Sequence, residues 1–244
     1  MVINYPLINR SERFITKSIT ELAKDSLSKT NLSKKTANIQ TIMDMLPAGN
    51  RRTVGNTSIA GPTFSNKSME ELKALKDAGI TDIVDFRAEA TPEFSERCQH
   101  LGFNFTNFPL ELMSNFSSSN IFIPNGNART KVSDNFVKNL KNFFEIVNKG
   151  NVYMGCKYGV HRTNTGVLLN YLLNPKQYPA PKMLNIDGEN KKTLINQTIN
   201  GVMKIIRRLS PEQRAELQIA NDFEKNIFPK KIGNLLAENR STIQ

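Results

Sequence analysis

Apolar residues recur at two different periods in the middle of the chain, and these periods predict helices that alternate with short strands. A spacing of three to four residues is typical of one face of a helix, whereas short apolar runs and strict alternation are typical of strands. This order favours an α/β domain with a largely parallel central sheet flanked by helices. The predicted helices cover residues 68–79, 91–102, 133–148 and 163–173, and the predicted strands cover residues 80–86, 103–110 and 151–154.

Start and stop signals fix several of these boundaries. Ser68 precedes Glu71 by three residues, the spacing of a capping box, and Gly79 supplies a C-terminal stop. Pro92 opens the next helix, because its missing N–H is not needed in the first turn. Residues 111–131 are rich in Ser, Asn and Gly, so we expect a long loop there, of the kind that is functional or mobile.

The segments on either side of this pattern predict helical extensions. Residues 1–50 are polar, with apolar positions at helical spacings and then a stretch rich in Lys, Ser and Asn. Residues 177–244 turn helical again, and the segment 210–213 combines a serine cap, a proline and a glutamine at the spacing of a helix start. We therefore expect an α/β domain over residues 51–176, with a polar helical extension before it and a helical extension after it.

Positive charge is concentrated in these extensions. The chain carries 33 Lys and Arg against 22 Asp and Glu, a formal net charge of +11. The basic excess is 5 over residues 1–52, 2 over residues 53–179 and 4 over residues 180–244. A basic surface attracts polyanions, so an anionic membrane surface is a candidate partner of the extensions. Solvated basic helices explain the same charge equally well.

Composition also bears on compartment and cofactors. No apolar run approaches the roughly 20 residues that a membrane-spanning helix needs, and charge near the N-terminus argues against a cleaved secretory signal. Two cysteines, Cys98 and Cys156, do not make a disulfide framework and fit a reducing compartment. We expect a cytoplasmic protein, or one in the host cytoplasm if it is an exported bacterial effector. With two His and two Cys, neither a metal site nor a cofactor is expected.

The most informative segment joins the predicted strand 151–154 to the predicted helix 163–173. Cys156 stands at the end of the strand and Arg162 at the start of the helix. Loop N–H groups and a helix N-terminus that converge in this way form a seat for a phosphate dianion. Gly159 lets the loop turn with positive φ or approach a ligand closely.

The same positive field favours the thiolate form of a cysteine at the start of the loop, and the thiolate is the nucleophilic form. Cys156 would attack phosphorus, and the planar fork of Arg162 would hold two phosphoryl oxygens. A phosphocysteine would form and then be hydrolysed by water. Thr163 could donate a hydrogen bond to the sulfur as it leaves in the second step.

The Cys-x5-Arg-Thr pattern on a strand, loop and helix resembles the protein tyrosine phosphatase superfamily, in particular its dual-specificity and atypical dual-specificity members. Residues 58–90 resemble the opening segment of that family, so that the likeness covers roughly residues 55–175. It implies a phosphatase-like α/β fold and argues against nucleic acid as the main partner. It also implies that the loop residues bind the substrate phosphate; these are Lys157, Tyr158, Gly159, Val160 and His161. His161 packing under the loop is an equal alternative.

The sequence departs from the family at three points. Gly155 replaces the histidine that helps to support the thiolate, and Asn164 stands where the family has glycine. The third departure concerns the aspartic acid that protonates the leaving group, because residues 112–133 contain no Asp or Glu. Glu111 is the first candidate for this acid. Asp134 is the second, although an aspartate there is more simply a favourable charge at a helix N-terminus.

Three functional alternatives follow. The first is a cysteine-dependent phosphatase that acts on phosphotyrosine or on phosphoserine and phosphothreonine in proteins. The second is a phosphatase of phosphoinositides or inositol phosphates, which Lys157 modestly favours because similar Cys-Lys loops occur in such family members. The third is a catalytically weak pseudophosphatase that binds phosphorylated ligands, which the missing histidine and the uncertain acid would favour.

Overall fold

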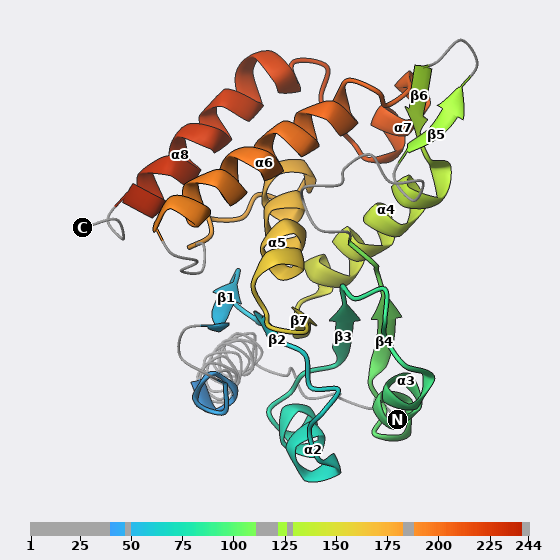
Figure 1. Ribbon diagram of the computed structural model, residues 1–244, viewed down its shortest axis with the longest axis vertical. Coiled ribbons are helices and arrows are strands. Elements are labelled where there is room, and N and C mark those ends of the chain that lie inside the picture. Colours follow the sequence, from blue (N-terminus) through green and yellow to red (C-terminus); the bar gives the residue numbers. More distant parts are fainter. Residues whose placement is uncertain (1–39, 47–49, 111–121, 126–128, 183–187, 241–244) are drawn as a thin grey trace, which may run out of the picture.

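A five-stranded sheet with its helices on both faces forms the centre of the molecule (Figure 1). The computed structural model describes residues 40–46, 50–110, 122–125, 129–182 and 188–240. The strands lie in the order β1-β2-β7-β3-β4; they are β1 (Arg52–Val54), β2 (Ser58–Pro62), β3 (Asp82–Asp85), β4 (Asn104–Asn107) and β7 (Val152–Cys156). All neighbours pair in parallel except β1 and β2. The predicted α/β class with a largely parallel sheet is confirmed.

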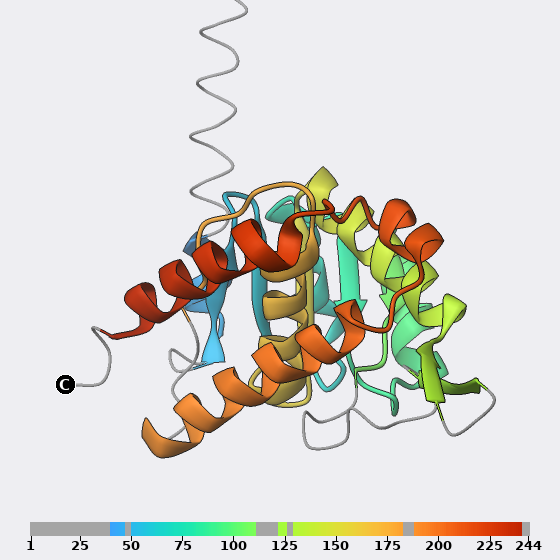
Figure 2. The same cartoon turned by 90° about the horizontal axis from the view of Figure 1, so that it is seen from above.

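The helices form layers above and below this sheet. Below it in Figure 1 lie α2 (Met69–Asp77) and α3 (Pro92–His100), and above it lie α4 (Asp134–Lys149) and α5 (His161–Leu173). A further layer covers α5; it contains α6 (Gly188–Ile206), α7 (Pro211–Glu216), the π-helical turn Phe223–Ile227 and α8 (Phe228–Arg240). Figure 2 shows α6 and α8 crossing α5 from the side that faces away from the sheet. No helix of the described segments is both long and apolar enough to cross a membrane.

Local sequence signals account for the start of several helices. The side chain of Ser68 accepts from the backbone N–H of Glu71, and the Glu71 carboxylate accepts from the backbone N–H of Ser68. Ser210 and Gln213 repeat this reciprocal pattern at α7. Both predicted capping boxes are therefore confirmed. The helix α5 starts at His161, two residues before its predicted start, because the loop turns directly into it.

Two hydrophobic clusters pack against opposite faces of the sheet, and β7 supplies both. Met154 belongs to the larger cluster under α4 and α5, whereas Tyr153 belongs to the smaller cluster under α2 and α3. Every residue of β7 is buried, as expected for a central parallel strand. The end of β7 is thus held from both faces and from both neighbouring strands.

Two hairpins were not predicted from the sequence. The strands β1 and β2 contain an arginine, a glycine and a proline in eight residues, which obscures any strand pattern. The hairpin of β5 (Phe122–Asn125) and β6 (Arg129–Val132) falls in the segment 111–131 predicted as a loop, except for its last residue. The first of these hairpins matters for function, because β2 lies directly beside β7.

The C-terminal helices share the larger core cluster rather than standing apart from it. Val202, Ile205 and Leu235 are fully buried, and Tyr171 on α5 donates a hydrogen bond to the carbonyl of Lys231. The helical character predicted for residues 177–244 is therefore present in the described part. The division of the chain into domains stays a prediction, and the predicted extension over residues 1–39 lies outside the described residues.

Close contact between α5 and the sheet gives a test of the fold. A Cβ atom on Gly166 would lie 2.3 Å from the ring of Phe86, whereas one on Gly233 in α8 meets nothing within 4 Å. We expect Gly166→Ala to lower the free energy of unfolding by about 1–3 kcal/mol through overpacking. Gly233→Ala should raise it by about 0.5–1 kcal/mol through helix propensity. Urea unfolding followed by circular dichroism measures both, and equal stability of the two variants would contradict the packing described.

Candidate active site

The loop between β7 and α5 is packed tightly against the end of β2. Gly159 has a φ of 71°, and a Cβ atom there would lie 2.4 Å from the backbone of Gly61. A Cβ atom on Gly155 would lie 2.6 Å from the carbonyl oxygen of Gly61. Both positions therefore need glycine, and the place before Cys156 has no room for the histidine that the resembled family carries.

Cys156 ends the central strand and is only 4% exposed. Its carbonyl oxygen accepts from the N–H of Thr63 at 2.8 Å and from the N–H of Gly159 at 3.1 Å, which fixes the first turn of the loop. The hydroxyl of Thr163 donates to the sulfur of Cys156 over 3.1 Å. The sulfur therefore has a hydrogen-bond donor in place, which favours negative charge on it.

The N-terminus of α5 is open toward the loop. Val160 occupies the N-cap position and makes no side-chain hydrogen bond to the first turn. The first N–H groups of a helix have no partner within the helix, and together they carry a partial positive charge. Such an end binds anions when no side chain caps it. The open helix end is compatible with the anion seat predicted from the sequence, and the seat itself stays a prediction.

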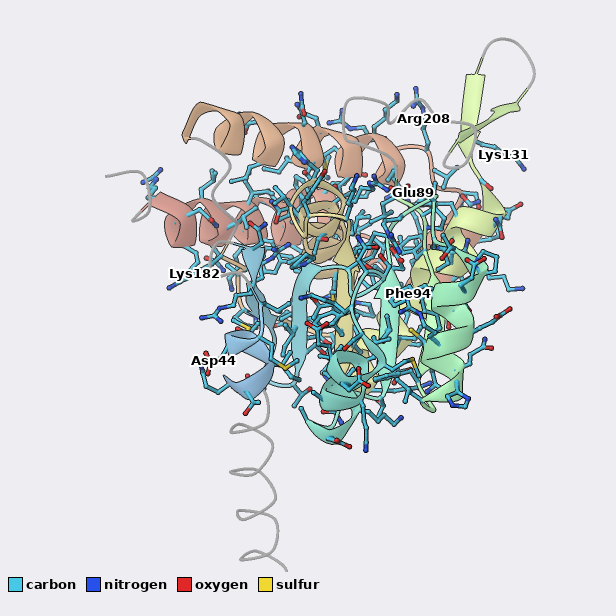
Figure 3. All side chains as sticks on the ribbon, turned by 60° about the horizontal axis from the view of Figure 1, so that its bottom comes forward. Asp44, Glu89, Phe94, Lys131, Lys182 and Arg208 are labelled. Carbon is cyan, nitrogen blue, oxygen red and sulfur yellow. The ribbon has the colours of Figure 1, made fainter. Side chains whose placement is uncertain are left out.

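Arg162 is held by a carboxylate from another part of the chain. Its Nη1 donates to Oε2 of Glu89 at 2.8 Å, and its Nη2 donates to Oε1 at 2.9 Å. The side chain of Arg162 is 20% exposed and that of Glu89 is 53% exposed. Hydrogen bonds from Arg162 lower the pKa of Glu89 to about 2, and the same contact raises the pKa of Arg162. Figure 3 shows Glu89 toward the middle of the molecule, well away from Lys182.

This ion pair leaves the guanidinium able to bind a second anion. A guanidinium has five N–H donors, and Glu89 takes one from each Nη atom. Three donors, including Nε–H, remain for phosphoryl oxygens. Glu89 therefore orients Arg162 without consuming its capacity to bind phosphate.

Glu89 was not among the acids predicted from the sequence, which were Glu111 and Asp134. It lies in the segment after β3, which a buried ion pair supports: Arg87 donates to Asp85 at 2.6 Å and to the hydroxyl of Ser65 at 3.0 Å. The predicted strand ended at Phe86, and Glu89 lies within residues 58–90, which resemble the opening segment of the family. The available signal was an acidic residue two positions after Arg87.

A second charged residue, Arg52 on β1, was also missed. It is 6% exposed, and its Nη1 donates to the carbonyl oxygen of Gly159 in the loop at 3.2 Å. Desolvation lowers its pKa to about 10, so the guanidinium is charged at neutral pH. Sequence gives little sign of this contact, because Arg52 and Gly159 are 107 positions apart.

The other loop residues named from the sequence lie at the rim. Lys157, Tyr158 and His161 are exposed, and the Lys157 ammonium lies 5.2 Å from the centre of the Tyr158 ring. Val160 is half-buried. Asn164 is fully buried in the first turn of α5, where its side-chain amide has no hydrogen-bond partner within the described structure.

Of the two candidate acids, only Asp134 belongs to the described residues. Glu111 lies outside the described residues. Asp134 begins α4, is 76% exposed, and makes its contacts with Gln213 at 2.5 Å and Lys131 at 4.0 Å. These contacts fit the alternative that Asp134 is a charge at a helix N-terminus. Glu89 is a poor acid at neutral pH, because a carboxyl with a pKa of about 2 has already lost its proton.

Two further features of the described segments concern metal-binding groups and clefts. No group of three or more His, Cys, Asp or Glu residues within them is arranged to hold a metal ion. A cleft of about 440 Å³ opens beside β1 and is lined by residues such as Arg51, Tyr178 and Lys182. This cleft includes none of the residues from Cys156 to Arg162, so it is separate from the anion seat.

The Glu89–Arg162 pair predicts a specific titration. Because the folded pKa is below the ordinary value of 4.5, the pair stabilises the fold above about pH 4.5, and this contribution is lost as the pH falls toward 2. NMR of the side-chain carboxyl, assigned with Glu89→Gln, should give a midpoint near 2 in the wild type. In Arg162→Met the midpoint should return to about 4.3. A wild-type midpoint of about 4.3 would show that the pair does not form in solution.

Comparisons with known proteins give solved structures of low similarity. No protein-family model matches the chain, and no curated protein matches it. The catalytic core of the PP-IP phosphatase Siw14 from S. cerevisiae is 14% identical, with a TM-score of 0.36 over 76% of this chain and 94% of that one. TpbA from P. aeruginosa is 13% identical, with a TM-score of 0.33 over 75% and 86%. DUSP15 is 14% identical, with a TM-score of 0.35 over 77% and 95%. These matches are protein tyrosine phosphatase-like, but at such values the likeness carries no argument about activity, which depends on the site itself.

Proposed function

We propose that this protein is a cysteine-dependent phosphatase that hydrolyses phosphomonoesters through a phosphocysteine intermediate. One observation carries the proposal: a single short loop brings the thiol of Cys156, the hydroxyl of Thr163 and the uncapped N-terminus of α5 to one point, with Arg162 at the same helix end. Each of these groups acts on a tetrahedral dianion or on the sulfur beneath it.

The first step transfers the phosphoryl group to sulfur. The Cys156 thiolate attacks phosphorus, the S–P bond forms, and the P–O bond to the leaving group breaks with its electron pair on oxygen. Arg162, oriented by Glu89, binds two phosphoryl oxygens and stabilises the charge on them. A general acid protonates the departing oxygen; Glu111 and Asp134 remain the candidates.

The second step regenerates the enzyme. Water attacks phosphorus, the S–P bond breaks, and inorganic phosphate leaves. The sulfur departs as a thiolate, and the 3.1 Å hydrogen bond from Thr163 stabilises that charge. The same base that lost its proton in the first step can accept one from the attacking water.

The rim of the site bears on the substrate. The exposed ring of Tyr158 offers a flat apolar surface beside the loop, which favours an aryl phosphate such as phosphotyrosine in a protein. The exposed Lys157 and His161 favour a more highly charged ligand, such as an inositol phosphate or a phosphoinositide. We propose phosphoprotein as the first substrate class and the inositol compounds as the alternative. A panel of phosphopeptides, phosphoinositides and inositol phosphates, compared by kcat/KM, distinguishes them.

The nucleophile is tested by exchanging each cysteine in turn. We expect Cys156→Ser to lower kcat for an aryl phosphate by roughly 10³-fold or more, because the alcohol is far less ionised than the thiol. Cys98→Ala is the matched control: Cys98 is fully buried in α3, and burial raises its pKa to about 12, so it stays an unreactive thiol. Its removal should leave kcat within about twofold, since it lies outside the site. Turnover that survives Cys156→Ser would refute the proposal.

The general acid is tested through the leaving group. Replacing the true acid should lower kcat by about 10²–10⁴-fold for an alkyl phosphate, whose leaving oxygen needs a proton. It should matter much less for an aryl phosphate with an acidic phenol. We expect this pattern from Glu111→Gln, and we expect Asp134→Asn to act mainly on stability, given its contacts with Gln213 and Lys131.

The opposite assignment follows if Asp134→Asn alone shows the dependence on the leaving group. If the wild type binds phosphorylated ligands but hydrolyses none of them, the second candidate function holds, namely a pseudophosphatase. Gly155 and the engagement of Asp134 with α7 are the observations that favour it.

A further inference from the structure

Arg52 is a buried cation with an unusual set of contacts. It lies on β1, is 6% exposed, and donates from Nη1 to the carbonyl of Gly159. Its Nε and Nη2 atoms are buried and have no hydrogen-bond partner, and it forms no ion pair with a carboxylate of the described residues. Burying a guanidinium without a counter-charge is costly, so its presence calls for a compensating function.

A purely structural role does not account for this residue. One hydrogen bond to a backbone carbonyl can be made by a neutral donor, and a neutral donor would avoid the desolvation of a charge. Two of the three guanidinium nitrogens would also remain without a partner in that role. A structural role therefore leaves the positive charge of Arg52 unexplained.

The cleft beside β1 does not supply the missing anion. Arg52 is among its lining residues, together with Arg51 and Lys182, but its two unpartnered nitrogens are sealed from the surface. A ligand in the cleft cannot reach them. Lys182, one of the lining residues, lies well to the left of Glu89 in Figure 3.

The nearby negative charge is that of the nucleophile. Among the groups around Arg52, the charges of Cys156 and Tyr153 are the ones that raise its pKa against the effect of burial. Tyr153 is itself fully buried, and burial raises its pKa well above the ordinary value, so it stays neutral. The strand register agrees with this: Arg52 lies beside Ala60 of β2, Ala60 lies beside Met154 of β7, and Arg52 contacts the loop after Cys156 at Gly159. Interaction between two charges is mutual, so a guanidinium that gains from the thiolate also favours the thiolate.

We propose that Arg52 is a positioning residue that holds Cys156 in its thiolate form and fixes the loop through Gly159. This inference rests on the proposed function, because it assigns Arg52 to the nucleophile of that reaction. It also accounts for Gly155: the close contact with Gly61 excludes a side chain before the nucleophile, and Arg52 on β1, the strand beyond β2, supplies positive charge instead. Arg52 touches no substrate and acts through Cys156.

The test measures the reactivity of Cys156 without any phosphate substrate. The rate of alkylation by iodoacetamide at Cys156, followed by mass spectrometry, is recorded from pH 4 to 9 in folded protein. Arg52→Met removes the charge but keeps an unbranched side chain. In this variant, the pH at which the alkylation rate of Cys156 is half-maximal should rise by about one unit, which corresponds to a roughly tenfold change in the equilibrium between thiol and thiolate. In Arg52→Lys, which keeps the charge, the profile should stay within about 0.3 unit of the wild type.

Arg51→Met is the matched control. Arg51 is the adjacent residue, and its contacts are with the carbonyl of Leu46 and, at 3.7 Å, with Asp44. The control removes the same charge from the chain, and we expect its profile to be unchanged. Equal shifts in Arg51→Met and Arg52→Met would overturn the proposal, because net charge would then be the cause. A folded Arg52→Met with an unmoved profile would also overturn it, since the role of Arg52 would be structural alone.

If Arg52→Met does not fold, the pH profile of Cys156 alkylation in Arg52→Lys tests the proposal. A profile within about 0.3 unit of the wild type supports the proposal, and a rise of a full unit overturns it. Alkylation requires no turnover, so the assignment of Arg52 can fail in an active phosphatase, and it can hold in a protein that hydrolyses nothing.

Discussion

The site depends on the close approach of two backbones, that of β2 and that of the loop after β7. Gly61 lies so near to Gly155 and Gly159 that a side chain at either position would overlap it. This contact sets where β7 ends, and the carbonyl of Cys156 is fixed there by N–H groups from Thr63 and from Gly159. The sulfur, the hydroxyl of Thr163 and the open end of α5 are then placed by one rigid junction rather than by separate loops.

Two arginines act on this junction in different ways. Arg162 is partly exposed and is neutralised by Glu89, so it is oriented before any ligand arrives and still has donors to offer. Arg52 is buried, has no carboxylate partner among the described residues, and contacts the loop from β1. The exposed charge suits recognition of the substrate, and the buried charge suits control of the nucleophile, because electrostatic effects grow as water is excluded.

Structural features that depend on neighbouring residues could be predicted from the sequence. The strand, loop and helix around Cys156 follow from neighbouring residues, and so do the capping boxes at Ser68 and Ser210. Glu89 and Arg52 could not be found in this way, since each meets the loop only after the sheet has formed, from 73 and 107 positions away in the chain. The hairpin of β1 and β2 was missed for a related reason: its residues are poor strand formers alone, and pairing with β7 stabilises them.

This geometry explains why position 155 carries glycine where the resembled family has histidine. A chain that packs β2 against the loop through glycine gains a rigid floor but loses the side chain that the resembled family uses to support its thiolate. Two arginines bring positive charge to this junction from other elements: Arg52 lies on β1, opposite Ala60 of β2, and Arg162 lies in the first turn of α5. Of these two, Arg52 is the buried one, and its hydrogen bond to the carbonyl of Gly159 joins its charge to the loop that follows the nucleophile.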